Sequence, residues 1–122
     1  MLVKGGHLEE RPGTDVLVTA DGCQVFGGEF IETRSTHGTG CTYSAAIATQ
    51  LALGHPLAEA IRRAKAYLTE AIRYGLPLGS GAGPTDHFFY LRHGQPAAWI
   101  ERTDTAAPAG TLPSAPSTEA RR

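Results

Sequence analysis

The stretch Thr36-His37-Gly38-Thr39-Gly40-Cys41-Thr42 runs directly into the alanine-rich segment 43–53. Gly38 and Gly40 can adopt backbone angles that are closed to other residues, so successive N–H groups can converge on one point. At the first turn of a helix, such N–H groups and the helix dipole form an anion-binding nest. A phosphate group is the expected guest, and the same position favours the thiolate form of Cys41. On this pattern alone, an ordinary glycine turn before a helix stays an alternative.

The residues that follow this motif predict two helices. The first covers Cys41–Leu53, with Gly54 just past its end and Pro56 opening the next helix. Small residues lie on all of its sides, so we expect it to pack closely and to be largely buried. The second helix carries one apolar stripe at three- and four-residue intervals. Its members are Leu57, Ala60, Ile61, Ala64, Leu68, Ala71, Ile72 and Gly75.

Short β-strands are predicted on both sides of the helices. Those before the helices, with a turn at Asp21-Gly22, are Leu2-Val3, Val16–Val18, Gln24–Phe26 and Phe30-Ile31. After the helices, a glycine-rich run at 78–84 precedes the aromatic stretch His87–Leu91, which is predicted as a strand, as is Ala97–Ile100. We interpret the first group as hairpins at the edge of a larger sheet.

The C-terminal segment differs in composition from the rest of the 122 residues. Thr103–Arg122 is rich in Pro, Ala, Ser and Thr and contains one large aliphatic residue, Leu112. Such a segment buries too little apolar surface to offset its ordering entropy. We therefore predict a folded part at 1–102 and a disordered tail at 103–122. Because the chain begins inside a strand, we expect it to be the C-terminal portion of a larger fold.

The charge balance and the cysteine count narrow the class of protein. Eleven Lys and Arg against twelve Asp and Glu give a net charge of −1, which argues against a nucleic-acid groove. No stretch approaches the ~20 apolar residues of a membrane helix, so no membrane partner is expected. Two cysteines, Cys23 and Cys41, are too few for a disulfide framework, and a reducing cytoplasm is the expected compartment.

Several familiar site patterns are missing from the sequence. No glycine-rich phosphate loop ends in Gly-Lys-Ser or Gly-Lys-Thr, and the glycines at 79–83 lack the dinucleotide-binding spacing. The five histidines form no i,i+4 pair, so a structural zinc site is not expected and the metal ligands stay unknown. A nucleophile pair of Cys41 and His37 is conceivable, but the sequence supplies no orienting third group.

Five short blocks occur in a specific order along residues 2–90. They are Val3-Lys4-Gly5-Gly6-His7-Leu8, Thr36–Thr42 with Ser44–Ala48, Ala64-Lys65, Gly83-Pro84 and His87-Phe88. Together they resemble the C-terminal half of the hydroxymethylpyrimidine/phosphomethylpyrimidine kinases of thiamine biosynthesis, in the ribokinase-like superfamily. Cys41 is specific to this resemblance, because sugar kinases of the superfamily usually carry aspartate there. The implied fold is α/β, the C-terminal portion of a three-layer α/β/α architecture with a mostly parallel sheet.

The resemblance also implies roles for individual residues. Gly38, Thr39, Gly40 and Cys41 match the anion hole that faces the transferred phosphoryl group, and Cys41 stands in the general-base position. Lys4 and Lys65 match lysines at the nucleotide site, so ATP and Mg²⁺ are the implied cofactors. Lys65 also lies at the margin of the apolar stripe, where a lysine extending to solvent would look the same.

Three functions stay open at this point. The first is ATP-dependent phosphorylation of hydroxymethylpyrimidine and its monophosphate; the second is a pyridoxal-type vitamin kinase. The third is a non-catalytic module that binds nucleotide or docks on a complete kinase. The acceptor pocket and the Mg²⁺ ligands of the family belong to its N-terminal half, so we expect this chain to be inactive alone. A homodimer stays open as its assembly state.

Overall fold

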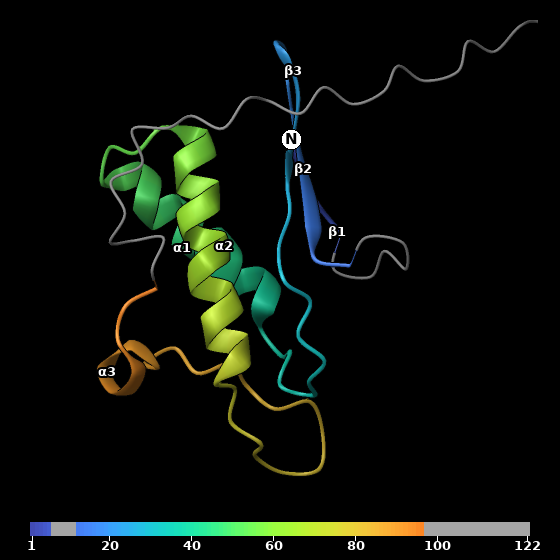
Figure 1. The fold of residues 1–122 in the computed structure, drawn as a ribbon, viewed down its shortest axis with the longest axis vertical. Coiled ribbons are helices and arrows are strands. Elements are labelled where there is room, and N and C mark those ends of the chain that lie inside the picture. Colours follow the sequence, from blue (N-terminus) through green and yellow to red (C-terminus); the bar gives the residue numbers. More distant parts are fainter. Residues whose placement is uncertain (6–11, 97–122) are drawn as a thin grey trace, which may run out of the picture. The chain divides into compact units, whose positions relative to one another are not determined.

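The computed structural model describes residues 1–5 and 12–96, which fall into two compact units. One unit contains residues 1–27, and the other begins at Gly28 (Figure 1). His7, the predicted strand Ala97–Ile100 and the tail Thr103–Arg122 lie outside the described residues. The expectations for these segments stay predictions.

The first unit is an antiparallel sheet with the strand order β1-β2-β3. The strands are β1 (Leu2–Gly5), β2 (Thr14–Thr19) and β3 (Gly22–Phe26). Asp15 of β2 is buried opposite Phe26, and its Oδ1 accepts a hydrogen bond from the Gly5 N–H at 3.2 Å. The predicted hairpin strands at 2–3, 16–18 and 24–26 are thus confirmed.

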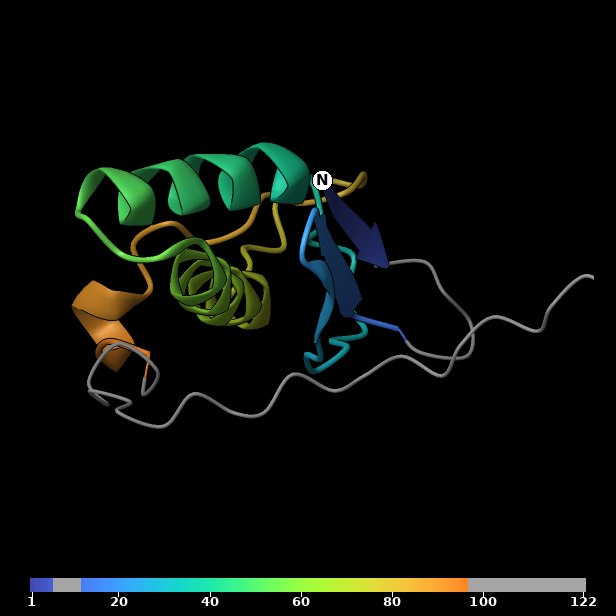
Figure 2. The ribbon, with the colours of Figure 1, turned by 90° about the horizontal axis from the view of Figure 1, so that it is seen from above.

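The second unit is built on α1 (Thr39–Ala52) and α2 (Leu57–Arg73), which pack on each other. Figure 2 shows α2 end-on while α1 runs lengthwise, so the two helices cross. Between them, Gly54 adopts a positive φ of 89°. The N–H groups of Gly54 and His55 donate to the carbonyls of Leu51 and Gln50, a Schellman motif that ends α1 as the sequence predicts.

The middle of the predicted apolar stripe of α2 faces the core, whereas its first member, Leu57, is 43 % exposed and its last, Gly75, lies beyond the end of the helix. Its buried members are Ala60, Ile61, Ala64 and Ala71, while Glu59 lies off the stripe and pairs with Arg63 at 2.8 Å. Burying small aliphatic residues at this spacing allows another helix to approach closely. The stripe therefore explains why α1 crosses α2 where it does.

The prediction that the first helix is largely buried is wrong. Tyr43 and Gln50 are its buried residues, whereas Ala45, Ala48 and Ala52 are exposed. The physical reason is that α2 covers one side of α1 and no described residue covers the opposite side. A helix with small residues all round is suited to packing on more than one surface.

The prediction of a strand at His87–Leu91 is also wrong, because this segment forms a turn followed by α3 (Tyr90–His93). Asp86 Oδ1 accepts the Phe88 N–H at 2.9 Å, and the Asp86 carboxylate also pairs with Arg92. This local bonding competes with a strand ladder. Phe89 is 1 % exposed, and the centroid of its ring lies 5.5 Å from that of Tyr67.

Phe30-Ile31 forms no strand within the described part of the chain, contrary to the prediction. The segment after Gly28 is instead held by side chains. Arg73 Nη2 of α2 donates to Glu29 Oε2 at 2.6 Å, and Phe30 is exposed. The ion pair lowers the pKa of Glu29 from its ordinary value, chiefly through the hydrogen bond from Arg73.

Ser35 lies in close contact with two glycines, Gly75 and Gly83. It is 4 % exposed, and its Oγ donates to the Leu76 carbonyl at 3.3 Å. A Cβ added at Gly75 would lie 2.4 Å from Ser35 Cβ, and one added at Gly83 would lie 2.5 Å from the Leu76 oxygen. Neither position has room for a side chain.

We predict that Gly75→Ala lowers the free energy of unfolding by about 1–3 kcal/mol, because the new methyl group overlaps Ser35. Urea denaturation followed by circular dichroism measures the change. The control is Gly81→Ala, where an added Cβ meets nothing within 4 Å. This control should be neutral or stabilising by less than about 1 kcal/mol. Equal losses for both variants would contradict the close approach at Ser35.

Candidate functional site

The turn that begins α1 has the backbone geometry of an anion site. Gly38 is in the left-handed region at φ 81° and ψ 3°, and α1 begins at Thr39. Only glycine adopts this conformation without strain. The Thr42 N–H donates to the Gly38 carbonyl at 2.9 Å, the first turn of the helix. Within the described residues, the N–H groups of Gly40 and Cys41 have no hydrogen-bond acceptor, as expected of a helix N-terminus.

Hydrogen bonds connect the segment before the Gly38 turn to the glycine-rich segment at 76–84. The His37 N–H donates to the Gly83 carbonyl at 3.1 Å, and the Gly83 N–H donates to the Arg34 carbonyl at 3.1 Å. His37 and Pro84 form a parallel bridge, and Arg34 Nη2 donates to the Ser80 carbonyl at 2.7 Å. The segment before the turn therefore has a fixed position relative to the loop after α2.

Cys41 has an exposed free thiol and lines an open groove of about 450 Å³. The groove is formed by α1, by one residue of α2 and by the loop before α3. Its lining residues are Cys41, Thr42, Ala45, Ala46, Thr49, Gln50, Tyr67 and His87. None of them is Lys, Arg, Asp or Glu, so the groove has little fixed charge.

Two groove residues were not singled out by the sequence. Gln50 is 8 % exposed, and its Oε1 is buried without a hydrogen-bond partner in the described structure. Tyr67 donates its hydroxyl to the His87 carbonyl at 3.0 Å. Burial raises the pKa of Tyr67 from its ordinary value, and the charges of Tyr90 and Asp86 act in the same direction. A lone glutamine inside an alanine-rich helix was the one available signal for Gln50.

The structure brings some of the predicted site residues together. Gly38, Thr39, Gly40 and Cys41 form one continuous turn, and Cys41 shares its groove with His87. His37 does not line that groove, so the structure gives the Cys41–His37 pair no support. Cys23 is exposed in β3.

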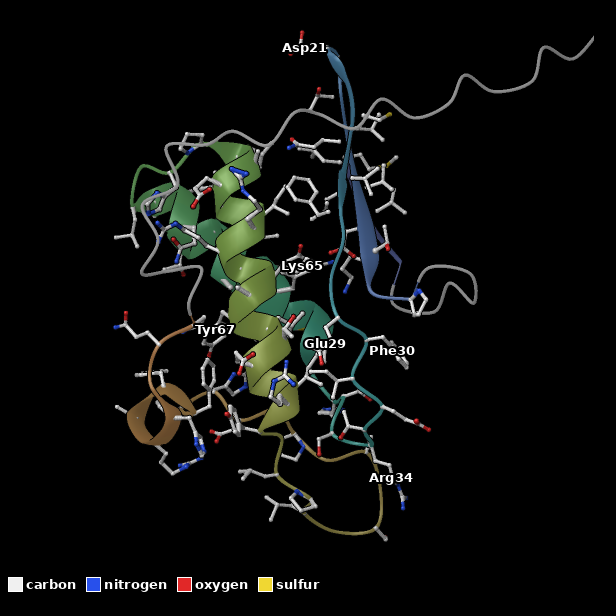
Figure 3. The ribbon with its side chains drawn as sticks, viewed as in Figure 1. Asp21, Glu29, Phe30, Arg34, Lys65 and Tyr67 are labelled. Carbon is white, nitrogen blue, oxygen red and sulfur yellow. The ribbon has the colours of Figure 1, made fainter. Side chains whose placement is uncertain are left out.

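The two lysines predicted for the nucleotide site lie in different units. Lys4 is exposed in β1, with its Cα opposite that of Asp15. Lys65 lies half-buried on α2, and it projects from the side of the helix opposite Tyr67 (Figure 3). Lys65 does not line the groove of Cys41. The nucleotide roles of both lysines stay predictions.

No cluster of three or more His, Cys, Asp or Glu side chains suited to a metal ion occurs among residues 1–5 and 12–96. In the same residues, no helix combines the length and the apolar character needed to cross a bilayer.

Comparison with known proteins identifies relatives that share one family description. The family model described as phosphomethylpyrimidine kinase matches residues 1–86. The hydroxymethylpyrimidine/phosphomethylpyrimidine kinase of Staphylococcus aureus strain MRSA252 is 44 % identical over 93 residues, covering 75 % of this chain and 34 % of the relative. The enzyme of the same name from Rhizobium meliloti is 51 % identical over 90 residues, covering 72 % and 34 %. The chain thus spans about a third of the length of these relatives.

Solved structures agree with this comparison. Pyridoxal kinase from Bacillus subtilis, in an ADP complex, is 41 % identical with a TM-score of 0.66, covering 70 % of this chain and 33 % of that one. Pyridoxal kinase from Staphylococcus aureus, in complex with AMP-PCP and pyridoxal, is 29 % identical with a TM-score of 0.70, covering 77 % and 36 %. Both likenesses support the predicted α/β fold.

We predict that Tyr67→Phe weakens the loss of stability at alkaline pH. The pKa of Tyr67 is raised in the folded state, so the unfolded chain loses this proton first. The contribution of Tyr67 is therefore complete below a pH of about 10 and disappears as the pH rises through the folded-state value. Urea denaturation at about pH 8 and about pH 11 measures the effect.

At the lower of these two pH values, the free energy of unfolding of Tyr67→Phe should be about 0.5–1.5 kcal/mol below that of the parent, because the variant lacks the hydrogen bond to the His87 carbonyl. Tyr74→Phe is the matched control in the same aromatic cluster. If the free energy of unfolding of Tyr67→Phe depends on pH as that of the parent does, the raised pKa of Tyr67 is contradicted.

Proposed function

The chain belongs to the phosphomethylpyrimidine kinase family, and we propose that it forms the phosphate-binding part of a kinase in thiamine biosynthesis. The reaction is transfer of the γ-phosphoryl group of ATP to hydroxymethylpyrimidine or to its monophosphate. One observation carries the proposal: the Gly38 turn leaves the N–H groups of Gly40 and Cys41 without an acceptor inside the described chain. Phosphoryl transfer depends mainly on positioning and on neutralising oxygen charge, which such groups provide.

Each member of the turn has a distinct task in this proposal. Gly38 sets the backbone direction, and Thr39, whose N–H donates to the Thr36 carbonyl at 3.4 Å, begins the helix. The amides of Gly40 and Cys41 face the phosphoryl oxygens at the positive end of α1. Lys4 and Lys65 neutralise the nucleotide phosphates. ATP as donor is supported by the solved pyridoxal kinases, which are described in complex with ADP and with AMP-PCP.

Residues 1–5 and 12–96 contain no cluster of three or more His, Cys, Asp or Glu side chains that could hold the Mg²⁺ that accompanies ATP in such transfers. We therefore assign no step to the metal here. Its ligands, and the pocket for the pyrimidine, belong to the part of the family's fold that the chain does not match. Consistent with this, we propose that the chain alone does not turn over substrate.

Cys41 has two chemical options in the proposed reaction. As a thiolate it would take the proton of the acceptor hydroxymethyl group; as a neutral thiol it would position that group while the phosphate receives the proton. The exposed thiol at the first turn of α1 is compatible with either option. The distinction can be tested by one substitution.

A pyridoxal-type vitamin kinase is the second candidate. The specific observation is the 41 % identity to the Bacillus subtilis pyridoxal kinase, close to the identities of the pyrimidine kinases. We further propose that the complete protein has the three-layer α/β/α fold, works in the cytoplasm and forms a homodimer.

The first test uses a chimera in which this chain replaces the matched 93 residues of the Staphylococcus aureus kinase. We expect ADP release that depends on hydroxymethylpyrimidine, measured by a coupled assay, and none from the 122-residue chain alone. Pyridoxal in place of the pyrimidine separates the two candidates. A folded chimera without activity on either acceptor would overturn the proposal, as would turnover by the chain alone.

The second test is Cys41→Ser in the same chimera. A thiolate base predicts a fall in kcat of more than about tenfold with little change in the KM for ATP. Cys23→Ser, in the hairpin, is the matched control and should leave both constants unchanged. If Cys41→Ser stays within about tenfold of the parent, the cysteine positions the acceptor instead.

A further inference from the structure

The segment 87–93 is apolar on two sides, and α2 covers one of them. Phe89 is buried and packs on the aromatic side of α2, whereas Phe88 and Leu91 are 60 % and 72 % exposed. The Leu91 N–H donates to the Phe88 carbonyl at 3.0 Å, so both exposed residues belong to one turn. The exposed ring of Tyr90 lies beside Phe88, with 6.5 Å between the ring centroids. A helical segment that is apolar all round is ordinarily buried all round.

Phe88, Tyr90 and Leu91 form what we call the α3 patch. Figure 2 shows α3 beside α2 and on a different side of it from α1, so this patch is separate from the groove of Cys41. The family model matches residues 1–86, and the patch lies beyond that match. Its cover is therefore to be expected among features of the chain that follow residue 86.

The chain turns back directly after α3. Gly94 ends this helix at φ 84°, a conformation that favours glycine, and its N–H donates to the Tyr90 carbonyl at 3.2 Å. Gln95 is exposed, but Pro96 is buried. Because a buried residue is covered by other atoms of the protein, the chain has not left the folded surface at Pro96.

The composition of the next four residues, Ala97-Ala98-Trp99-Ile100, suits the patch. They include two of the three large apolar residues that follow residue 96, the third being Leu112. Trp99 comes three residues after Pro96, a separation that extended chain spans in about 10 Å. The four residues of α3 rise by only about 6 Å, so Trp99 can reach any part of the patch. A tether this short gives an effective concentration of about a millimolar or more, which favours this segment over a second copy of the chain.

We propose that the segment 97–100 docks on the α3 patch and that Trp99 covers Phe88 and Leu91. The indole ring supplies a large apolar area from a side chain with few rotatable bonds, which suits it to this task. The docked segment holds α3 on α2 and so steadies the loop of His87, whose carbonyl accepts the hydroxyl of an α2 tyrosine. The proposal does not depend on the proposed reaction, because docking is measured without turnover.

The fluorescence of Trp99 tests the proposal in the 122-residue chain, which has one tryptophan. Relative to the urea-denatured chain, we expect a blue-shifted emission maximum and weaker quenching by acrylamide. Leu91→Asp should move both quantities to the values of the denatured chain while circular dichroism shows the helices intact. Leu78→Asp is the matched control, since this leucine is 62 % exposed in the glycine-rich loop, and it should change neither quantity. A denatured-like emission in the parent, or equal effects of the two variants, would overturn the proposal.

Dilution distinguishes the chain's own segment from a second copy as the cover of the patch. A contact within one chain leaves the emission maximum of Trp99 independent of protein concentration, and we expect this result. An emission maximum that shifts to the blue only as the concentration rises, in parallel with dimer formation measured by sedimentation, would assign the patch to a second copy and refute the proposal.

A labelling measurement covers the case in which Leu91→Asp does not fold. Leu91→Cys, made in a background with Cys23→Ser and Cys41→Ser, should react slowly with a maleimide because Trp99 covers it. Adding Trp99→Ala should raise this rate to that of Leu78→Cys, the exposed control. The rate of Leu78→Cys itself should be the same with and without Trp99→Ala. If Trp99→Ala leaves the rate of Leu91→Cys unchanged, the docking of this segment is disproved.

Discussion

The candidate site depends on the backbone pairing between the segment before α1 and the glycine-rich loop after α2. His37 and Arg34 exchange hydrogen bonds with Gly83, and buried Ser35 fills the space that side chains at Gly75 and Gly83 would need. This close approach requires glycine on one side and a small side chain on the other. It fixes where the Gly38 turn begins, and so fixes the direction of the first amides of α1.

Packing around α2 supports the same arrangement. Its buried alanines let α1 cross closely, and Tyr67 and Tyr74 hold Phe89, which anchors the loop containing His87. Cys41 thereby shares a groove with residues that lie far along the chain.

The sequence predicted the features that depend on local physics. Helix ends follow from Gly38 and Gly54, the stripe of α2 from its periodicity, and the hairpins from the Asp21-Gly22 turn. The strand predicted at His87–Leu91 failed because periodicity could not reveal that the Asp86 carboxylate bonds to the Phe88 N–H. Burial of α1 was overestimated because small residues show that close packing is allowed, whereas coverage depends on which surfaces are present. Gln50 and Tyr67 line the groove because of tertiary packing, which no local sequence motif predicts.

The central claim is that the first amides of α1 bind a phosphate oxygen. Amide proton and nitrogen shifts of the ¹⁵N-labelled chain, followed by NMR during titration with ADP, test it most directly. The account predicts saturable shifts at Gly38, Thr39, Gly40 and Cys41, with Gly54 and Gly94, which also have positive φ, unaffected as internal controls. Shifts confined to other amides, or equal at all of these glycines, would contradict the claim.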